Sequence, residues 1–188
     1  MNAAYDISLA RPRDLPHINH IELAAARLLV GHAPESVLAE ATPIAVLDAV
    51  QRAGRLWIAR VNETPVGFAH VELFEPNVAH LDELDVHPEH GRRGIGAGLV
   101  RTVCRWAAAT GYSAVTLCTF RDVPWNMPFY AKLGFDLIPA AELSRELQAV
   151  VDDETRRGLD PTRRVVMRWP APAVAAQSRP IPRPVPAR

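Results

Sequence analysis

The feature that most constrains the fold lies in the middle of the chain, in the stretch 81–110, LDELDVHPEHGRRGIGAGLVRTVCRWAAAT. Its first six residues predict a β-strand, in which Leu84 and Val86 share one face and the acidic residues beside them point to the other. His87-Pro88 ends the strand, because proline cannot donate to a ladder and restricts the residue before it. A loop over 89–94 follows, rich in glycine and arginine. The stretch therefore predicts a strand, a loop with little side-chain bulk, and a helix.

The helix predicted after this loop carries a wide apolar stripe, as expected for a helix packed on a sheet. The stripe consists of Ile95, Leu99, Val100, Val103, Cys104, Trp106 and Ala107. Gly111 predicts a left-handed cap at its C-terminal end. Its start has no bulky side chain and is preceded by Arg92 and Arg93, and a helix N-terminus of this kind favours phosphate groups.

Length and composition indicate a single folded domain and give no sign of a nucleic-acid-binding or membrane-binding protein. A chain of 188 residues is long enough to bury roughly 70% of its unfolded surface in one domain. We predict that domain over 1–169, and a disordered tail rich in Pro, Ala and Arg over 170–188. Basic and acidic residues each number 21, and the pI is near 7.1, so charge gives no case for nucleic acid or a membrane surface.

The same survey predicts a cytoplasmic protein. Cys104 and Cys118 lie in apolar runs without metal-ligand spacing and are expected to be reduced, buried thiols. The first residues lack the pattern of a signal peptide, and no apolar run approaches the roughly 20 residues of a membrane span. His87 and His90 have a ligand-like spacing but no further ligands nearby, so no metal site is predicted.

The remaining elements follow from hydrophobic periodicity and from the positions of Gly and Pro. Strands are predicted over 5–10, 55–61, 66–74, 78–86, 114–119, 135–138 and 164–169, and helices over 15–29, 35–53 (interrupted near 42–43), 95–110, 126–133 and 142–158. The last helix is expected to be mostly solvated. Strands 55–61 and 66–74 form a hairpin, and the strand after the central helix is expected to run parallel to the one before it.

Three kinds of phosphate-binding loop could occupy residues 91–99. A dinucleotide-binding fingerprint needs G-x-G-x-x-G in a first strand–helix unit, but here Gly94-Ile95-Gly96 is followed by a glycine out of register, after a hairpin. A P-loop needs Lys and Ser/Thr where this chain has Ala97-Gly98. Both patterns fail.

The third kind is the acetyl-CoA loop of the GCN5-related N-acetyltransferase (GNAT) superfamily, which the chain resembles in two motifs. The first is Q/R-x-x-G-x-G/A after a strand ending in Leu-x-Val, matched by Leu84-Asp85-Val86 and by Arg92-Arg93-Gly94-Ile95-Gly96-Ala97. Gly91 stands where the family usually has Gln or Arg. The second is N…FYxKLGF, matched by residues 126–135, NMPFYAKLGF. The resemblance covers roughly residues 5–169.

This resemblance implies an α/β (α+β) fold with a mixed, mostly antiparallel twisted sheet of about six or seven strands, flanked by helices. It also implies acetyl-CoA as cosubstrate. The backbone at Val86, with Leu84 and Asp85, is expected to pair with the pantetheine arm like an added strand. The amides of the loop Gly91–Ala97 would hold the pyrophosphate, helped by Arg92 or Arg93. Asn126 is expected to hydrogen-bond the pantetheine, to cap the following helix, or both.

Acetyl transfer to an amine requires a group that accepts a proton, because an amine of pKa about 10.4 is neutral in only about one molecule in 2,500 at pH 7. Glu83 is the first choice, since strand alternation puts it opposite the apolar face. His80, Asp82, Asp85 or a water chain are alternatives. By resemblance, Tyr130 would be the acid that protonates the departing thiolate.

We therefore predict an N-acetyltransferase that works by direct attack in a ternary complex on a small amine or a protein amine. A homodimer is compatible with the sequence. A non-catalytic acyl-CoA-binding regulatory module is the alternative, in which Glu83 and Tyr130 would be dispensable. A nucleotide-dependent oxidoreductase is the third option, and would require NAD(P) binding without CoA binding.

Overall fold

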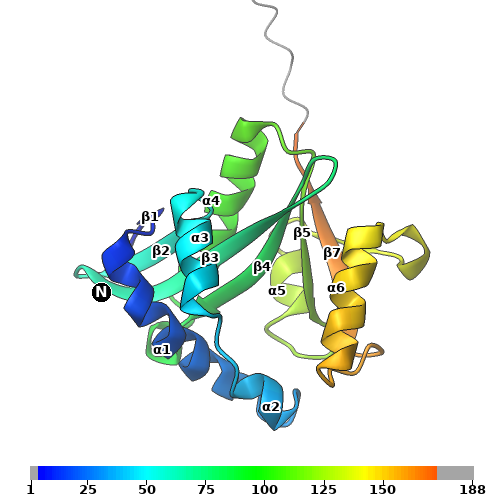
Figure 1. Cartoon of the computed structure of the whole chain (residues 1–188), viewed down its shortest axis with the longest axis horizontal. Helices are drawn as coiled ribbons and strands as arrows, with labels where there is room; N and C mark the ends of the chain where they lie inside the picture. The colour runs from blue at the N-terminus through cyan, green and yellow to red at the C-terminus, as the bar shows by residue number, and fades with distance from the viewer. Residues whose placement is uncertain (1–3, 173–188) are drawn as a thin grey trace, which may run out of the picture.

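The computed structural model describes residues 4–172, which form a mixed α/β structure around one seven-stranded sheet (Figure 1). The strand order is β1-β2-β3-β4-β5-β7-β6. The strands are β1 (Asp6–Leu9), β2 (Leu56–Val61), β3 (Thr64–Phe74), β4 (Val78–Val86), β5 (Ala114–Phe120), β6 (Asp136–Ile138) and β7 (Arg164–Pro170). The helices are α1 (Leu15–Ala26), α2 (Glu35–Leu38), α3 (Ile44–Arg52), α4 (Ile95–Thr110), α5 (Met127–Ala131) and α6 (Arg145–Arg156), with short 3-10 turns between some elements. The predicted fold class is confirmed.

Strand pairing is antiparallel throughout the sheet except between β4 and β5, which are parallel as predicted. The β2–β3 hairpin turns through Asn62 and Glu63 alone, both at positive φ, so β3 begins two residues earlier than predicted. In the β3–β4 ladder, His70 is opposite Glu83 and Val71 is opposite Leu81, so Asp82 is an extra residue of β4. This β-bulge re-aims the side chains that follow it.

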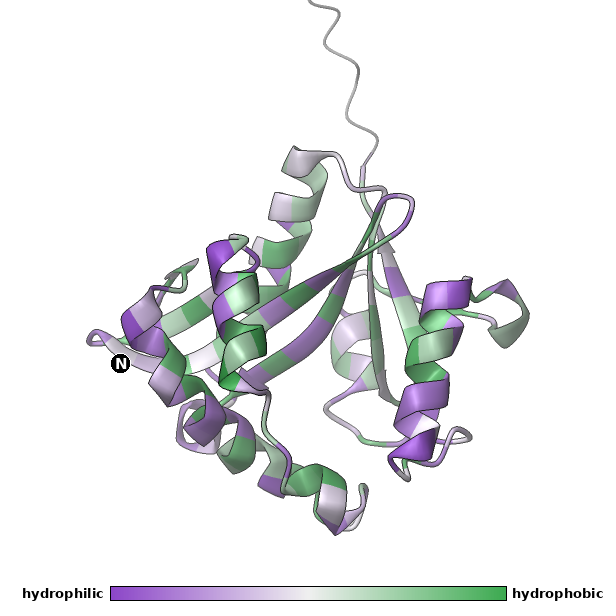
Figure 2. Ribbon diagram, in the orientation of Figure 1, coloured by the Kyte–Doolittle hydropathy of each residue, from purple (hydrophilic) through white to green (hydrophobic). Residues whose placement is uncertain are grey.

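Two hydrophobic cores lie on opposite faces of the sheet. One lies against α4 and contains the predicted stripe of that helix, including Leu99 and Val103, which are fully buried. The other lies between the sheet and α1 and α3, with Ile18, Leu47 and Phe68 at its centre. Figure 2 shows hydrophobic and hydrophilic residues alternating along β3 and β4, as a sheet with two differently used faces requires. The cores hold α4 on one face and α1 and α3 on the other.

A third, smaller cluster links the two halves of the sheet beyond the ends of β4 and β5. Phe120, Val123 and Leu159 are buried there, with Leu29 and Val37 packed on them. Two polar contacts reinforce the link: Arg157 pairs with Glu40 at 2.6 Å, and the Arg163 guanidinium donates to the His32 carbonyl at 3.1 Å. The segment around α2 is thereby tied to the segment around α6.

Several elements differ in extent from their predictions. Helix α1 ends at Ala26 and continues as a 3-10 turn, and the helix predicted over 35–53 is two helices, because Pro43 begins a new one. Helix α6 is not simply solvated, since Leu147 and Glu154 are buried. Strand β7 includes Pro170, and the Ala171 amide donates to the Ser113 carbonyl; the rest of the predicted tail, from 173, lies outside the described residues. Across 4–172, no helix combines the length and apolar character that crossing a membrane requires.

Candidate active site

The site begins where β4 and β5 separate. The two strands pair only over Val78–His80 and Ala114–Thr116, after which β5 continues along β7 and β4 continues along β3 alone. Figure 1 shows the two strands diverging below this point. The stretch 81–86 of β4 therefore has an edge that faces the opening with backbone groups not used by β5. Such an edge can accept an extended ligand as an added strand.

The glycine-rich loop and the start of α4 lie at the end of this free edge. Gly94 caps the helix in a left-handed conformation, with φ of +84°, and the first helical bond runs from the Gly98 amide to the Gly94 carbonyl at 2.9 Å. The amides of Ile95, Gly96 and Ala97 belong to the first turn, which has no preceding carbonyls to accept from them. Aligned amides at a helix N-terminus suit a phosphate group.

The arginines of the loop are exposed, and their roles in the fold differ. The Arg93 guanidinium donates to the Glu89 carbonyl at 3.0 Å, while Arg92 has a positive φ of 58°. Gly91, at the position where the family usually has Gln or Arg, has its amide bonded to the Pro88 carbonyl. A Cβ at Gly91 would lie 3.1 Å from that carbonyl oxygen. The tight turn thus accounts for glycine at this position.

The two sequence motifs meet in space. A Cβ placed on Gly96 would lie 3.6 Å from the Phe129 ring and 3.8 Å from the Val86 side chain, so the loop packs against both α5 and the end of β4. Tyr5, which the sequence did not single out, also holds the loop. Its hydroxyl donates to the Gly94 carbonyl at 3.2 Å, and Gly98 leaves room for its ring. Segments up to 89 residues apart in the sequence therefore shape one loop.

The predicted base lies on the face of β4 opposite the α4 core. Leu84 and Val86 pack toward that core, while Glu83 and Asp85 point away from it, as alternation predicted. Burial, followed by the Asp82 and Glu22 carboxylates, raises the pKa of Glu83 to about 8. Burial also raises the pKa of Asp85 well above its usual range, with Glu83 as the next cause. The charge of Glu83 therefore acts on Asp85, two residues along the same face of β4.

Glu22 of α1 is a residue of this site that the sequence did not identify. Its carboxylate accepts hydrogen bonds from the Thr42 amide, at 2.9 and 3.0 Å to its two oxygens, and from the Thr42 hydroxyl at 2.8 Å. Burial raises the pKa of Glu22, and its charge in turn raises the pKa values of Asp82, Glu83 and Asp85. No local signal marks Glu22, because its position depends on how α1 packs across β4.

Tyr130, the predicted acid, lies on α5 with its ring against Phe129 and Phe135, at centroid distances of 5.0 and 5.8 Å. Burial raises the pKa of its phenol above the usual value of 10, and the Glu83 and Asp85 charges raise it further. Tyr130 is therefore within electrostatic range of both carboxylates. The charges of the candidate bases therefore act on the candidate acid.

Two other candidates have positions that limit their roles. His80, an alternative base, is buried in the paired part of β4; its Nδ1 lies 3.0 Å from the Thr116 hydroxyl, and burial lowers its pKa to about 4. Its backbone is in the last pair between β4 and β5, and its ring stacks on Phe74. Asn126 is the N-cap residue of α5, but its side chain makes no capping hydrogen bond, so its amide is not used by the helix start.

The fold has well-matched solved structures. The ribosomal-protein-S18-alanine N-acetyltransferase of Escherichia coli superposes with a TM-score of 0.64 at 18% identity, covering 93% of this chain and 98% of that one. The PaiA N-acetyltransferase of Thermoplasma acidophilum, solved in complex with coenzyme A, superposes with a TM-score of 0.68 at 17% identity, covering 89% and 99%. At these identities the likeness establishes the fold, which is that of N-acetyltransferases.

Sequence comparison gives the family. The profile of the acetyltransferase (GNAT) family matches residues 21–135, more than half of the chain. The chain therefore belongs to the acetyltransferase (GNAT) family, as the two motifs predicted. Human N-acetyltransferase 8 is 34% identical over 90 residues, which are 45% of this chain and 40% of that protein, so the match spans less than half of the relative's length.

Proposed function

We propose that this protein transfers the acetyl group of acetyl-CoA to a primary amine by direct attack in a ternary complex. The observation that carries the proposal is the arrangement around the free edge of β4. The free edge of β4 ends at the N-terminus of α4, which is suited to phosphate. The face of β4 that points away from α4 carries Glu83, whose pKa is raised. The charges of Glu83 and Asp85 also raise the pKa of Tyr130, which supports its inclusion in the proposed site. Family membership supports this class of reaction.

Acetyl-CoA would bind along the α4 side of this opening. The backbone of Leu84, Asp85 and Val86 would pair with the pantetheine arm, since β5 does not use this edge. The amides of the loop Gly91–Ala97 would hold the pyrophosphate, and the exposed Arg92 and Arg93 would add charge. The unused side-chain amide of Asn126 supports a hydrogen bond to the pantetheine.

Glu83 is the proposed base. A base works best when its pKa lies near the working pH, and burial places the pKa of Glu83 at about 8. As the amine nitrogen bonds to the thioester carbon, its proton passes to the Glu83 carboxylate, directly or through water. Asp85 is the alternative on the same face, and burial also raises its pKa.

Tyr130 is the proposed acid for the leaving thiolate. As the carbon–sulfur bond breaks, the electron pair stays on sulfur, and the phenol hydroxyl donates to it. Because the pKa of Tyr130 is raised above 10, complete proton transfer to the thiolate is less favourable than from an ordinary tyrosine. We therefore propose that Tyr130 first stabilises the thiolate through a hydrogen bond.

The acceptor is proposed to be a cationic primary amine, either small or part of a protein. Neighbouring charges contribute to the raised pKa values of Asp82, Glu83 and Asp85, so an ammonium group bound among them would lower this repulsion and favour the ionised carboxylates. The similar structures include a ribosomal-protein-S18-alanine N-acetyltransferase and an N-acetylglutamate synthase, so they leave the choice between a protein amine and a small amine open. A single domain over 1–169 and a cytoplasmic location remain part of the proposal.

The experiment is calorimetry with acetyl-CoA followed by release of free thiol in the presence of a panel of amines. Binding with amine-dependent thiol release supports the proposal. Binding without turnover across a broad panel would favour the non-catalytic acyl-CoA-binding module. Binding of NAD(P) but not CoA would favour an oxidoreductase and contradict the proposal.

A further inference from the structure

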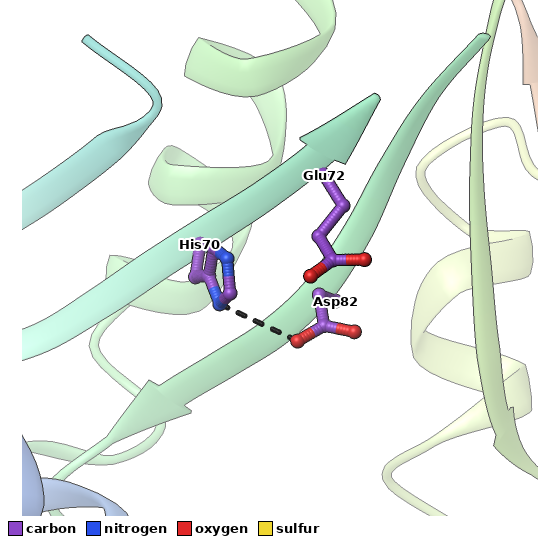
Figure 3. Close-up of side chains that lie close together, drawn as sticks. All are labelled: His70, Glu72 and Asp82. Atoms are coloured by element: carbon purple, nitrogen blue, oxygen red, sulfur yellow. Dashed lines mark ion pairs between the residues drawn. The ribbon is translucent and has the colours of Figure 1, made fainter. Parts of the chain in front are cut away.

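Three side chains with metal-ligating atoms lie together on β3 and β4, and one of them, Asp82, was also named above among the acidic residues near Glu83. They are His70, Glu72 and Asp82, and one ligand atom from each lies within 4.8 Å of the other two (Figure 3). Figure 3 shows the three side chains pointing toward one another from the two neighbouring strands. It is the one cluster of this kind in the part of the chain that the structure describes.

The backbone explains why these residues meet. His70 and Glu72 are two residues apart on β3 and so project from the same face. Asp82 joins them because of the β-bulge, which inserts it into β4 between the partners of Val71 and His70. All three are therefore carried by paired strands, and β3 is held on both sides by β2 and β4. A site on such elements is more precisely positioned than one on a loop.

His70 gives a second, independent indication of a ligand. Its side chain is only 1% exposed, yet neither ring nitrogen has a hydrogen-bond partner among the residues described. A buried polar group left without a partner destabilises the folded state. Its Nδ1 points at the cluster and lies 3.4 Å from Asp82 Oδ2. A ligand that bonds to this nitrogen would satisfy one of the two unpaired positions.

The geometry and chemistry of the donors point to a divalent transition-metal ion. Two ligands bound tetrahedrally at about 2.1 Å lie about 3.4 Å apart, which matches the separation of His70 and Asp82. One imidazole and two carboxylates suit zinc and its neighbours, whereas magnesium and calcium take oxygen donors alone. The two carboxylates also balance the charge of a divalent cation. The Asp82 side chain is 40% exposed, which leaves the ion open to water on one side.

We propose that His70, Glu72 and Asp82 bind one divalent transition-metal ion, with zinc as the probe. The sequence analysis predicted no metal site because His87 and His90 have no further ligands nearby. The cluster of His70, Glu72 and Asp82 is formed by strand pairing, which no local sequence pattern indicates. The proposal concerns ion binding alone and does not depend on acetyl transfer.

The test is calorimetric titration of the untagged full chain with Zn²⁺, beside Asp82→Asn and Glu72→Gln. Loss of an outer-shell partner of a metal site typically weakens binding about 10- to 100-fold, so loss of a direct ligand should weaken it at least about tenfold. Far-UV circular dichroism in metal-free buffer checks that the variants fold. If one carboxylate variant does not fold, the other still tests the proposal. The visible absorption of bound Co²⁺ should report a tetrahedral site in the wild type and change in both variants.

The matched control is the double variant His87→Ala/His90→Ala. It removes two histidines that lie outside the proposed site and whose ring centroids are 6.3 Å apart. One ion per chain, weakened in both carboxylate variants and unchanged in the double variant, supports the proposal. It is overturned if the wild type binds no Zn²⁺, if both carboxylate variants bind as tightly as the wild type, or if binding is lost in the double variant.

Discussion

The strongest prediction concerns the pH dependence set by Glu83. With a pKa of about 8, the carboxyl group is about 9% ionised at pH 7 and about 91% ionised at pH 9. If Glu83 accepts the proton, kcat/KM should rise about tenfold between these pH values in the wild type, because this constant reports the free enzyme. Glu83→Gln should lower kcat/KM and remove this rise with pH, which is the acidic limb of the pH profile. Asp82→Asn removes a neighbouring charge that raises the pKa, so its limb should move to lower pH.

The assay is thiol release from acetyl-CoA with a weakly basic amine of pKa below about 6, which stays neutral across the range and so contributes no titration of its own. Glu75→Gln, an exposed residue in the β3–β4 turn, is the matched control and should keep the wild-type profile. An unchanged limb in Glu83→Gln would refute the assignment. In that case Asp85 is the next residue to test.

Three further predictions follow from particular contacts. Tyr130→Phe should lower kcat about tenfold or more with little change in acetyl-CoA affinity, measured by steady-state kinetics and calorimetry, and an unchanged kcat would remove Tyr130 as the acid. Gly96→Asp should abolish acetyl-CoA binding, because it places a charge against the pyrophosphate. Gly96→Ala should still fold, since its Cβ makes only ordinary contacts. Tight binding of acetyl-CoA by Gly96→Asp would contradict the assignment of the loop. Asp14→Ala should lower the free energy of unfolding in urea by about 3–5 kcal/mol, because it leaves buried Arg60 without the carboxylate that lies 2.5 Å away. Asp48→Ala, which removes an exposed ion pair with Arg52, should lower it by less than about 1 kcal/mol. Equal effects of the two variants would contradict the stabilising role of the buried pair.

Local sequence signals predicted most of the fold. The alternation around Leu84 and Val86, the left-handed cap at Gly111 and the apolar stripe of α4 all depend on neighbours within a few residues, and all three are found. Glycine register in the loop distinguished the GNAT pattern from the dinucleotide-binding and P-loop patterns, and the second motif packs on the loop through Gly96 and Phe129.

The features missed by the sequence depend on strand register and helix packing. The early separation of β4 from β5 depends on how many residues pair between strands about 30 residues apart, which no local pattern records. The same holds for the bulge at Asp82, which places it beside His70. Glu22 belongs to an ordinary amphipathic helix, and only the packing of α1 on the sheet brings it near Glu83. Residues of the acceptor side were therefore harder to predict than those of the loop.

The central claim is acetyl transfer at the opening between β4 and β5. The most direct measurement is to incubate the protein with acetyl-CoA carrying an isotopically labelled acetyl group and the amine panel, and to follow the label by mass spectrometry. We predict labelled N-acetylated product from at least one cationic primary amine with the wild type, and none with Gly96→Asp. Binding of acetyl-CoA with no labelled product from any amine, or equal labelling by Gly96→Asp, would contradict the account.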